Sequence, residues 1–247
     1  MKNKIKKEIQ DFKILMKNVP ASILTLFVLG VVLMNILANK ELVSVGSWLA
    51  LDCGMLISWL AFFTMDVIDR RFGPKAAIKL NFVAVSINLF VAIVLAVVSL
   101  IKGNWSAAYN VNEEFMPLVN QALDSTFGGT WYVLFGSTIA FLVSGIVHSI
   151  VNWSLTKLLG NSSRKNYLIV SYASTSIAQL VDNLVFAFIV SYVFFGWTLL
   201  QCVTCAITGM LMEIFFELLF GPVGYKLTEN WRKQGIGNEY LEAIGGK

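Results

Sequence analysis

The chain has 247 residues, of which 57% are hydrophobic and only 14% charged, and its formal net charge is +4. Soluble domains contain about a quarter charged residues, and the mean hydropathy here is +0.70, so the composition excludes a soluble globular domain. We therefore expect an all-α, polytopic integral membrane protein. The net charge requires no nucleic-acid partner, because a basic surface facing anionic membrane lipid accounts for it.

Segment 1–18 is basic and precedes the first apolar stretch. Six lysines stand before Pro20, and no small-residue cleavage site follows a short apolar core, so we do not expect a signal peptide. The segment instead predicts a cytoplasmic amphipathic helix on the inner membrane surface, with an apolar side made of Ile5, Ile9, Phe12 and Leu15.

Six apolar windows without Lys or Arg follow, each long enough for a helix to cross the ~30 Å hydrocarbon core. They span residues 19–38, 47–65, 80–101, 131–155, 168–195 and 197–221. The last two windows meet at Gly196 and Trp197, where we expect a tight turn. These windows predict a transmembrane domain of six helices over 19–225, followed by a polar, loosely held cytoplasmic tail over 226–247.

The positive charges predict the orientation of these six helices. Of the 19 Lys and Arg residues, all except Lys40 and Lys102 fall on one side of the membrane. Because positively charged loops stay in the cytoplasm, we expect both termini inside a bacterial cell and the acidic loop 102–130 outside. Within this loop, residues 113–127 predict a short helix.

No motif for catalysis or metal binding stands out. Cys202 and Cys205 have C-x-x-C spacing, but no second cysteine pair or histidine cluster supports a metal, so helix packing is the favoured interpretation. The chain also lacks a P-loop, a G-x-S-x-G elbow and an H-E-x-x-H helix. We therefore do not expect an enzyme, and we expect neither a cofactor nor a metal.

Acidic residues within the apolar windows are the most unusual feature. They are Asp52, Asp182, Glu213 and Glu217, with Asp66 closing the second window. An ionisable group inside the bilayer costs roughly 2.5–3.5 kcal/mol and usually faces a cavity or a partner. Glu213 and Glu217 are one helical turn apart, so their mutual repulsion calls for a proton or a cation.

Further polar residues share helix faces with these acids. Interhelical hydrogen bonds explain isolated Ser and Thr residues, but an amide one turn from a carboxylate favours a polar binding cavity. The face of the fifth window has residues spaced by four, three and four, namely Thr175, Gln179, Asp182 and Phe186. A polar stripe in the fourth window consists of Ser137, Ser144, His148 and Asn152.

Three segments resemble the signature segments of the VUT family, the queuosine-precursor transporters of bacteria. They are "MDVIDRRFGPKAA" (65–77), "STSIAQLVDNLVF" (174–186) and "EIFFELLFGPVGY" (213–225), within a resemblance that runs from about 47 to 226. The resemblance implies a six-span protein of the cytoplasmic membrane. It also implies uptake of a 7-deazaguanine, such as 7-cyano- or 7-aminomethyl-7-deazaguanine, or queuine.

The resemblance also assigns residues to the family's motifs. The matching positions are Asp66, Gly73, Ser174, Thr175, Gln179, Asp182, Glu217, Pro222 and Tyr225. Arg70 stands where the family usually has Glu, and Glu213 stands where it usually has Lys. Such an exchange is what a spatially close ion pair would permit. In the fourth window, Ser144-Gly145 replaces a Gly-Gln pair and His148 replaces an Asp.

The expected substrate-binding residues are Asp66, Arg70, His148, Thr175, Gln179, Asp182, Glu213 and Glu217. A carboxylate can accept the ring N–H and the exocyclic amine of a deazaguanine side by side, and an amide such as Gln179 can donate to its carbonyl. Phe186 or Trp59 could stack on the flat ring. An amine on the substrate would be attracted to acidic residues, but so would a proton or sodium.

Two alternatives stay open. The same fold could carry another nucleobase or a vitamin. The chain could also be the substrate-binding subunit of an uptake complex with separate ATPase and coupling proteins, because it has no ATP site of its own. The expected partners are a small-molecule substrate and membrane lipid, and the oligomeric state, including a homo-oligomer, is left open.

Overall fold

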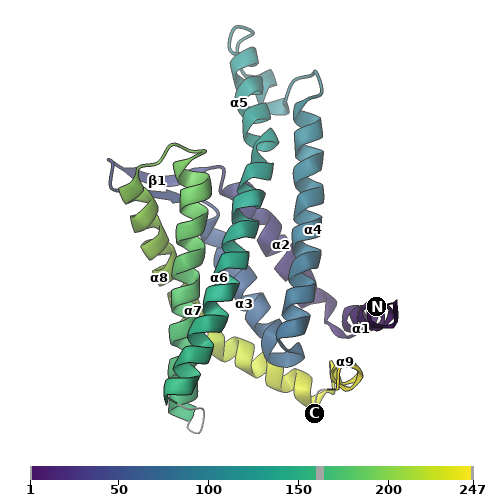
Figure 1. Cartoon of the computed structure of the whole chain (residues 1–247). Helices are drawn as coiled ribbons and strands as arrows, with labels where there is room; N and C mark the ends of the chain where they lie inside the picture. The colour runs from purple at the N-terminus through teal and green to yellow at the C-terminus, as the bar shows by residue number, and fades with distance from the viewer. Residues whose placement is uncertain (1, 160–163, 246–247) are drawn as a thin grey trace. The chain divides into compact units, whose positions relative to one another are not determined.

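The computed structural model describes residues 2–159 and 164–245, and the all-α prediction is confirmed (Figure 1). The α-helices are α1 (Lys2–Asn18), α2 (Ala21–Leu37), α3 (Met55–Phe72), α4 (Pro74–Ser99), α5 (Met116–Gly128), α6 (Thr130–Leu159), α7 (Arg164–Phe186), α8 (Leu199–Lys233) and α9 (Asn238–Ala243). The remaining elements are the strands β1 (Glu41–Val45) and β2 (Leu49–Asp52), the 3-10 helix η1 (Ser106–Asn110) and the π-helical η2 (Ala187–Tyr192).

Each predicted window overlaps at least one helix, but not all of these helices have membrane-spanning character. Within the described residues, four stretches are long and apolar enough to cross a membrane: α4, Met116–His148, Tyr172–Tyr192 and α8. A fifth exists if α1 and α2, which meet at a bend of 103°, form one span. By itself α2 has 17 residues, and the 18 residues of α3 end in a charged turn. A multi-pass helical membrane protein is therefore supported, whereas six spans with both termini inside stay a prediction.

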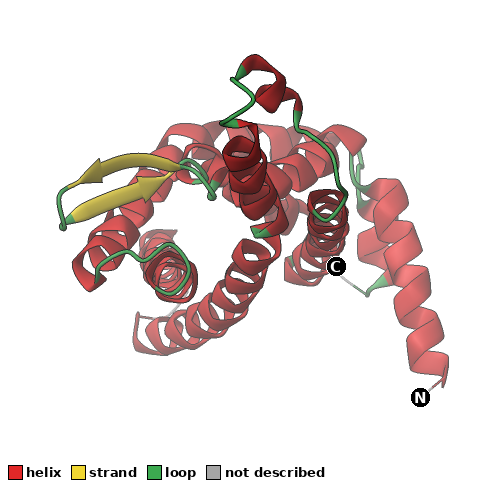
Figure 2. Cartoon of the chain, turned by 90° about the horizontal axis from the view of Figure 1, so that it is seen from above, coloured by secondary structure: helices red, strands yellow, loops and turns green. Residues whose placement is uncertain are grey.

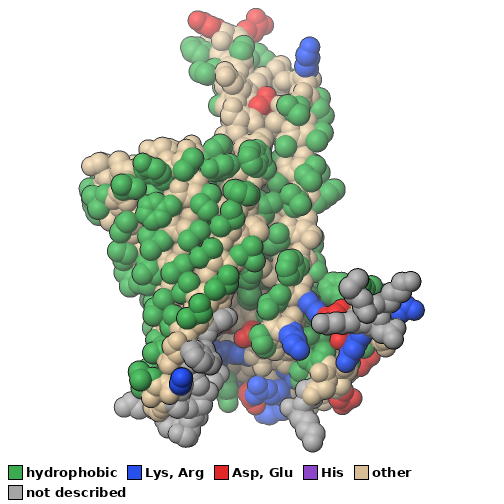
Figure 3. Space-filling model, viewed as in Figure 1, with side chains coloured by type: hydrophobic (Ala, Val, Ile, Leu, Met, Phe, Trp, Pro, Cys, Tyr) green, Lys and Arg blue, Asp and Glu red, His purple; other side chains and the backbone are tan. Residues whose placement is uncertain are grey.

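Apolar side chains on the helix surfaces agree with this class. In Figure 3, hydrophobic side chains cover most of the visible helix surface, and Lys, Arg, Asp and Glu gather near helix ends. On α4, Phe82 and Phe90 are 64% and 66% exposed. Large apolar side chains at such exposure are expected where the solvent is lipid rather than water.

The predicted start of the second span is wrong. Residues 47–52 belong to an antiparallel hairpin of β1 and β2, in which Ser44 lies opposite Ala50 (Figure 2). Gly46 takes a φ of +52° at the turn, and this conformation favours glycine. The helix α3 starts only at Met55 and continues past the predicted end at residue 65.

Asp52 consequently does not lie inside a transmembrane helix. It ends strand β2, and its carboxylate accepts a hydrogen bond of 2.8 Å from the N–H of Gly54. A carboxylate in this position satisfies backbone donors at the start of α3, as Asp does before many helices. The buried charge is therefore explained by local backbone structure.

The chain divides into two compact units. The first comprises Met1–Leu33, Ile57–Asn88 and Phe215–Lys247, and the second comprises Met34–Leu56 and Leu89–Ile214.

In the first unit, the segment after Tyr225 is not the loosely held tail that the sequence predicted. Helix α8 extends beyond Tyr225 to Lys233, and α9 packs beside α1 (Figure 1). Phe72 at the end of α3 lies 6.2 Å from Trp231 and 6.3 Å from Tyr240, measured between ring centroids. Tyr240 is fully buried, so these aromatic contacts fix the end of the described chain to α3.

Helix α1 and the short helix α5 were predicted correctly as elements. The apolar side of α1 includes Leu15, which is fully buried, whereas Ile5 and Ile9 are about half exposed. Helix α5 lies within the predicted range 113–127 except for its last residue, Gly128.

Gly73, which separates α3 from α4, has a φ of +85°, so this one-residue turn explains the glycine of the "FGP" segment.

In the second unit, α6 packs along α7 and η2. Gly136 on α6 approaches Val190 so closely that a Cβ at position 136 would overlap the Val190 side chain.

The predicted turn between the last two windows is confirmed, with Gly196 at a φ of +73°. Cys202 and Cys205 are buried free thiols in a cluster with Trp197, as the packing interpretation predicted.

Candidate functional site

The second unit places Asp182 in direct contact with a hydroxyl of the neighbouring helix. Asp182 lies on α7, on the face that it shares with Thr175 and Gln179 through the 3.6-residue helical period. Its Oδ1 accepts a hydrogen bond of 2.8 Å from the hydroxyl of Ser144 on α6. Ser144 is 8% exposed and Asp182 is half-buried, and the bond between them fixes the orientation of the carboxylate.

The neighbouring residue of Asp182 makes a second interhelical contact, this time with α8. The amide of Asn183 donates to Oε2 of Glu213 over 3.3 Å, and Glu213 is 5% exposed. Gly209, one turn before Glu213, permits this approach, because a Cβ there would lie 3.1 Å from the Asn183 amide nitrogen. The two polar neighbours on α7 therefore connect α6 on one side and α8 on the other.

The side chain of Gln179 has a buried oxygen atom without a hydrogen-bond partner among the described residues. It is 7% exposed, and its amide oxygen accepts no hydrogen bond from any residue that the structure describes. A buried acceptor without a partner costs about 1–3 kcal/mol. The amide can also rotate by 180° to present its N–H₂ group instead. This position, one turn from Asp182, can therefore serve a ligand donor or a ligand acceptor.

The other predicted residues of the second unit lie on the same helices without a direct bond to Asp182. His148 is half-buried on α6, one turn after Ser144, and Thr175 is half-buried on α7, one turn before Gln179. Ser174, the neighbour of Thr175, is fully buried. Asn152, which the sequence placed in the stripe of His148, falls outside the described side chains.

The first unit brings together the remaining predicted residues, Asp66, Arg70 and Glu217. Asp66 and Arg70 are one turn apart on α3, and both interact electrostatically with Glu217 on α8. The helices approach closely because of Gly224, where a Cβ would lie 3.1 Å from Val67. Two carboxylates of like charge and the guanidinium of Arg70 therefore act on one another here.

The two aromatic residues that we expected to stack on a substrate pack against protein side chains instead. Trp59 on α3 stacks on Phe216 and Phe220 of α8, at ring-centroid distances of 5.0 and 4.7 Å. Phe186 at the end of α7 packs against a buried cluster that includes Val133. Neither ring is needed as a substrate platform to explain its position.

Arg70 belongs to the first unit and Glu213 to the second, so their pairing stays a prediction. One contact of Glu213 is the hydrogen bond that it accepts from Asn183. On α3, the backbone carbonyl of Arg70 accepts a hydrogen bond of 3.4 Å from Arg232.

Sequence reasoning missed two amides, Asn183, which is half-buried, and Asn88, which is buried. Asn183 follows Asp182 directly, and its position beside an intramembrane acid was the available signal. Asn88 on α4 is fully buried, and neither atom of its amide has a hydrogen-bond partner among the described residues. No sequence pattern singled out Asn88, because one amide in a long apolar helix resembles ordinary interhelical hydrogen bonding.

Membrane-length helices that hold buried and half-buried carboxylates and amides define a class, the polytopic membrane transport proteins. The model of the family described as "Putative vitamin uptake transporter" matches residues 52–227, which include every predicted site residue. The chain belongs to this family, the VUT family. Membership in a transporter family agrees with the expectation that the chain is not an enzyme. No curated protein and no solved structure matches the chain.

Proposed function

We propose that the chain imports a queuosine precursor, a 7-deazaguanine, across the cytoplasmic membrane of a bacterium. The observation that carries this proposal is the buried amide oxygen of Gln179, which has no hydrogen-bond partner among the described residues. It lies one turn from the carboxylate of Asp182, which Ser144 orients. Family membership supports uptake as the activity, and the three signature-like segments support the substrate class.

The chemistry of a deazaguanine suits this pair. The ring N–H and the exocyclic amine form two parallel donors, which a single carboxylate can accept. Asp182 retains acceptor capacity for them, because a carboxylate has about four lone-pair sites and Ser144 uses one. The Gln179 amide then meets the ring carbonyl with its N–H₂ group.

The other site residues take supporting roles in this proposal. Thr175 on α7 and His148 on α6 flank this pair as further polar residues, and Asn183 donates a hydrogen bond to Glu213 of α8. In the first unit, the like charges of Asp66 and Glu217, with Arg70 beside Glu217, suit a proton or a coupling cation. Six spans with both termini in the cytoplasm complete the proposed arrangement.

The experiment that tests the substrate uses a host that can neither synthesise nor import queuosine precursors. Cells expressing the chain receive 7-cyano-7-deazaguanine, 7-aminomethyl-7-deazaguanine or queuine separately, and queuosine in tRNA is measured. We expect restoration with at least one of the three. If the protein reaches the membrane and none of them restores queuosine, the proposed substrate class is wrong.

A second candidate function is that of a substrate-binding subunit in an ATP-driven vitamin or nucleobase uptake complex. The family description names vitamins, and the sequence contains no P-loop. Uptake by a host that lacks separate ATPase and coupling proteins would favour the self-sufficient transporter. Uptake that appears only when such proteins are added would favour the subunit.

A further inference from the structure

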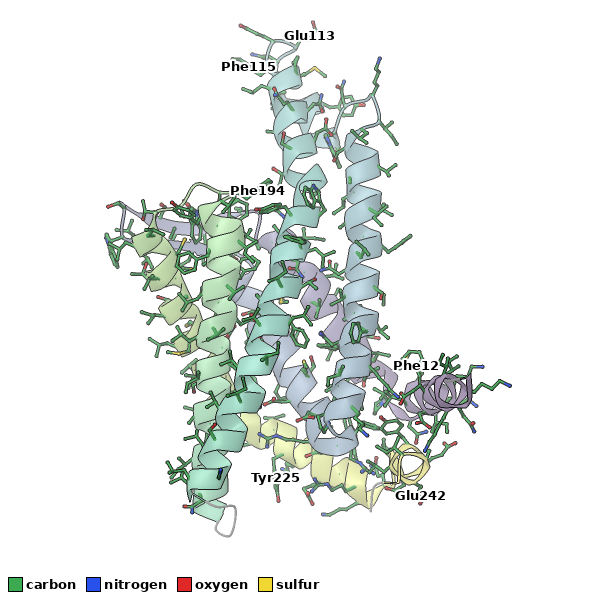
Figure 4. All side chains as sticks on the ribbon, viewed as in Figure 1. Phe12, Glu113, Phe115, Phe194, Tyr225 and Glu242 are labelled. Carbon is green, nitrogen blue, oxygen red and sulfur yellow. The ribbon has the colours of Figure 1, made fainter. Side chains whose placement is uncertain are left out.

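An apolar groove of about 650 Å³ lies in the first unit between α1 and α4. From α1 it is lined by Ile5, Ile9 and Phe12, and from α4 by Phe82 and Ile87 among others. Phe12 is labelled in Figure 4, on the helix nearest the N-terminus. The groove lies away from Asp66, Arg70 and Glu217, none of which lines it, and the proposed function assigns it no role.

The direction of α1 places this groove where a membrane surface would be. Helix α1 meets α2 at 103°, so α1 lies along the membrane surface if α2 enters the bilayer. One face of α1 is turned to the protein, since Asp11 and Leu15 are 7% and 0% exposed. The neighbouring face carries Ile5 and Ile9 at 53% and 52% exposure, which is the arrangement of an interfacial amphipathic helix.

A row of lysines flanks the exposed apolar face of α1. Lys6, Lys13 and Lys17 are spaced by seven and four residues, so they lie on one side of the helix, and all three are exposed. Their long side chains can extend from the apolar face toward a lipid phosphate. The row is therefore complementary in charge to anionic headgroups.

An ion pair in the wall of the groove involves neither Lys6, Lys13 nor Lys17. Nζ of Lys79 lies 2.8 Å from Oε2 of Glu8, so these two opposite charges neutralise each other. The wall therefore combines apolar side chains with a neutral pair, and the positive charge stands at its rim. An acyl chain fits the wall, and a negative headgroup fits the rim.

We propose that this groove binds the acyl chain of an anionic phospholipid, with the lysine row holding the headgroup. A lipid is favoured over a protein partner because α4 is a membrane-length helix whose side chains at the groove, Phe82 and Ile87, are exposed. The lipid belongs to the cytoplasmic leaflet under the proposed orientation. The site itself does not depend on the substrate that the chain carries.

The test uses the purified full chain in neutral detergent. Binding of phosphatidylglycerol and of phosphatidylcholine with identical acyl chains is measured by native mass spectrometry. Each lysine near an anionic surface contributes about fivefold in affinity, so three lysines give a preference on the order of a hundredfold for phosphatidylglycerol. A third arm replaces the lipid with glycerol phosphate, which has the headgroup charge without the chains.

Two variants and one matched control separate the headgroup from the groove. K6Q/K13Q/K17Q should remove the preference for phosphatidylglycerol, whereas K7Q/K226Q/K233Q, which loses the same charge at exposed positions outside the row, should keep it. S86W fills the groove from α4 and should lower the affinity for both lipids.

Four results would overturn the proposal. They are equal affinity of the wild-type chain for both lipids, an unchanged preference in K6Q/K13Q/K17Q, unchanged lipid binding in S86W, and binding of glycerol phosphate as strong as that of phosphatidylglycerol. The last result would assign the lysines to free phosphate instead.

Discussion

Replacing Asp182 by Asn tests the centre of the proposed binding site with little change in shape. The side-chain oxygen of the variant can still accept the 2.8 Å hydrogen bond from Ser144, so the contact between α6 and α7 is retained. The other atom becomes an N–H₂ donor that faces the donors of the substrate. We therefore expect D182N to reach the membrane in normal amounts and to bind a 7-deazaguanine weakly.

The magnitude follows from the bonds that are lost. A hydrogen bond to a charged group contributes about 1.5–3 kcal/mol, and 1.4 kcal/mol corresponds to a factor of ten. Losing one such bond lowers the affinity by roughly 10- to 150-fold, and a donor facing a donor lowers it further. Ser144→Ala removes only the group that orients the carboxylate, so a smaller loss is expected, about fivefold for a bond of ~1 kcal/mol.

The assay is binding of the precursor that restores queuosine, measured on the purified protein, together with uptake in cells. Glu114→Gln serves as the matched control, because it makes the same acid-to-amide change at an exposed position of the loop 102–130. We expect E114Q to behave as the wild type. Near-normal affinity and uptake in D182N would reduce Asp182 to a packing role and refute the proposed recognition.

Three further predictions concern topology, charge and packing. A cysteine placed between residues 103 and 130 should react with an impermeant thiol reagent in intact cells, and labelling in the loop near residues 157–166 instead would reverse the orientation. Arg70→Glu and Glu213→Lys should each impair uptake, and the double variant should recover by about 0.5–3 kcal/mol if the two residues are coupled; strictly additive losses would show that they are not. Gly136→Leu should destabilise the protein by roughly 1–3 kcal/mol through overlap with Val190, measured as a lower thermal midpoint, and an unchanged midpoint would contradict the close packing of α6 on η2.

The helices were predictable because their signals are continuous over many residues. Every apolar window overlaps a helix, and the amphipathic pattern of α1 and the short helix α5 were also found. The hairpin was missed because residues 47–52 are mostly apolar and directly precede the apolar residues of α3. In the sequence the two stretches therefore form one continuous apolar window. Only Gly46, with its φ of +52°, marks the turn locally, and one glycine is a weak signal against a long hydropathic run.

The tail was mispredicted for a different physical reason. Residues 226–247 are polar in composition, so they gave no apolar pattern. Their order comes from a few long-range contacts, in which Phe72 meets Trp231 and Tyr240, and Arg71 donates to Asn238 over 2.7 Å. Contacts between residues far apart in sequence leave no local periodicity, and composition alone therefore suggested a loose segment.

Some features of the site were likewise predictable from local spacing, whereas others depend on contacts between residues far apart in sequence. Helical spacing predicted correctly that Thr175, Gln179 and Asp182 share a face. Spacing could not tell that Ser144 would contact Asp182, or that Asn183 would contact Glu213, because such pairs depend on the rotation of neighbouring helices. Buried but unpaired groups such as the Gln179 oxygen can be identified only once packing is known.

The contact of Asn183 with Glu213 bears on the exchanged charges. An amide can donate its N–H₂ group to a carboxylate or, after rotation by 180°, offer its oxygen to an ammonium group. Asn183 can therefore form a hydrogen bond with Glu213 in this chain, or with the Lys that the family usually has at this position. Neither bond requires Arg70. If Asn183 is the decisive partner, Glu213→Lys alone is tolerated, and Asn183→Leu makes either charge harmful because a buried charge then loses its hydrogen bond. If Arg70 is decisive, Glu213→Lys is harmful even with Asn183 intact, and only the second exchange, Arg70→Glu, restores uptake.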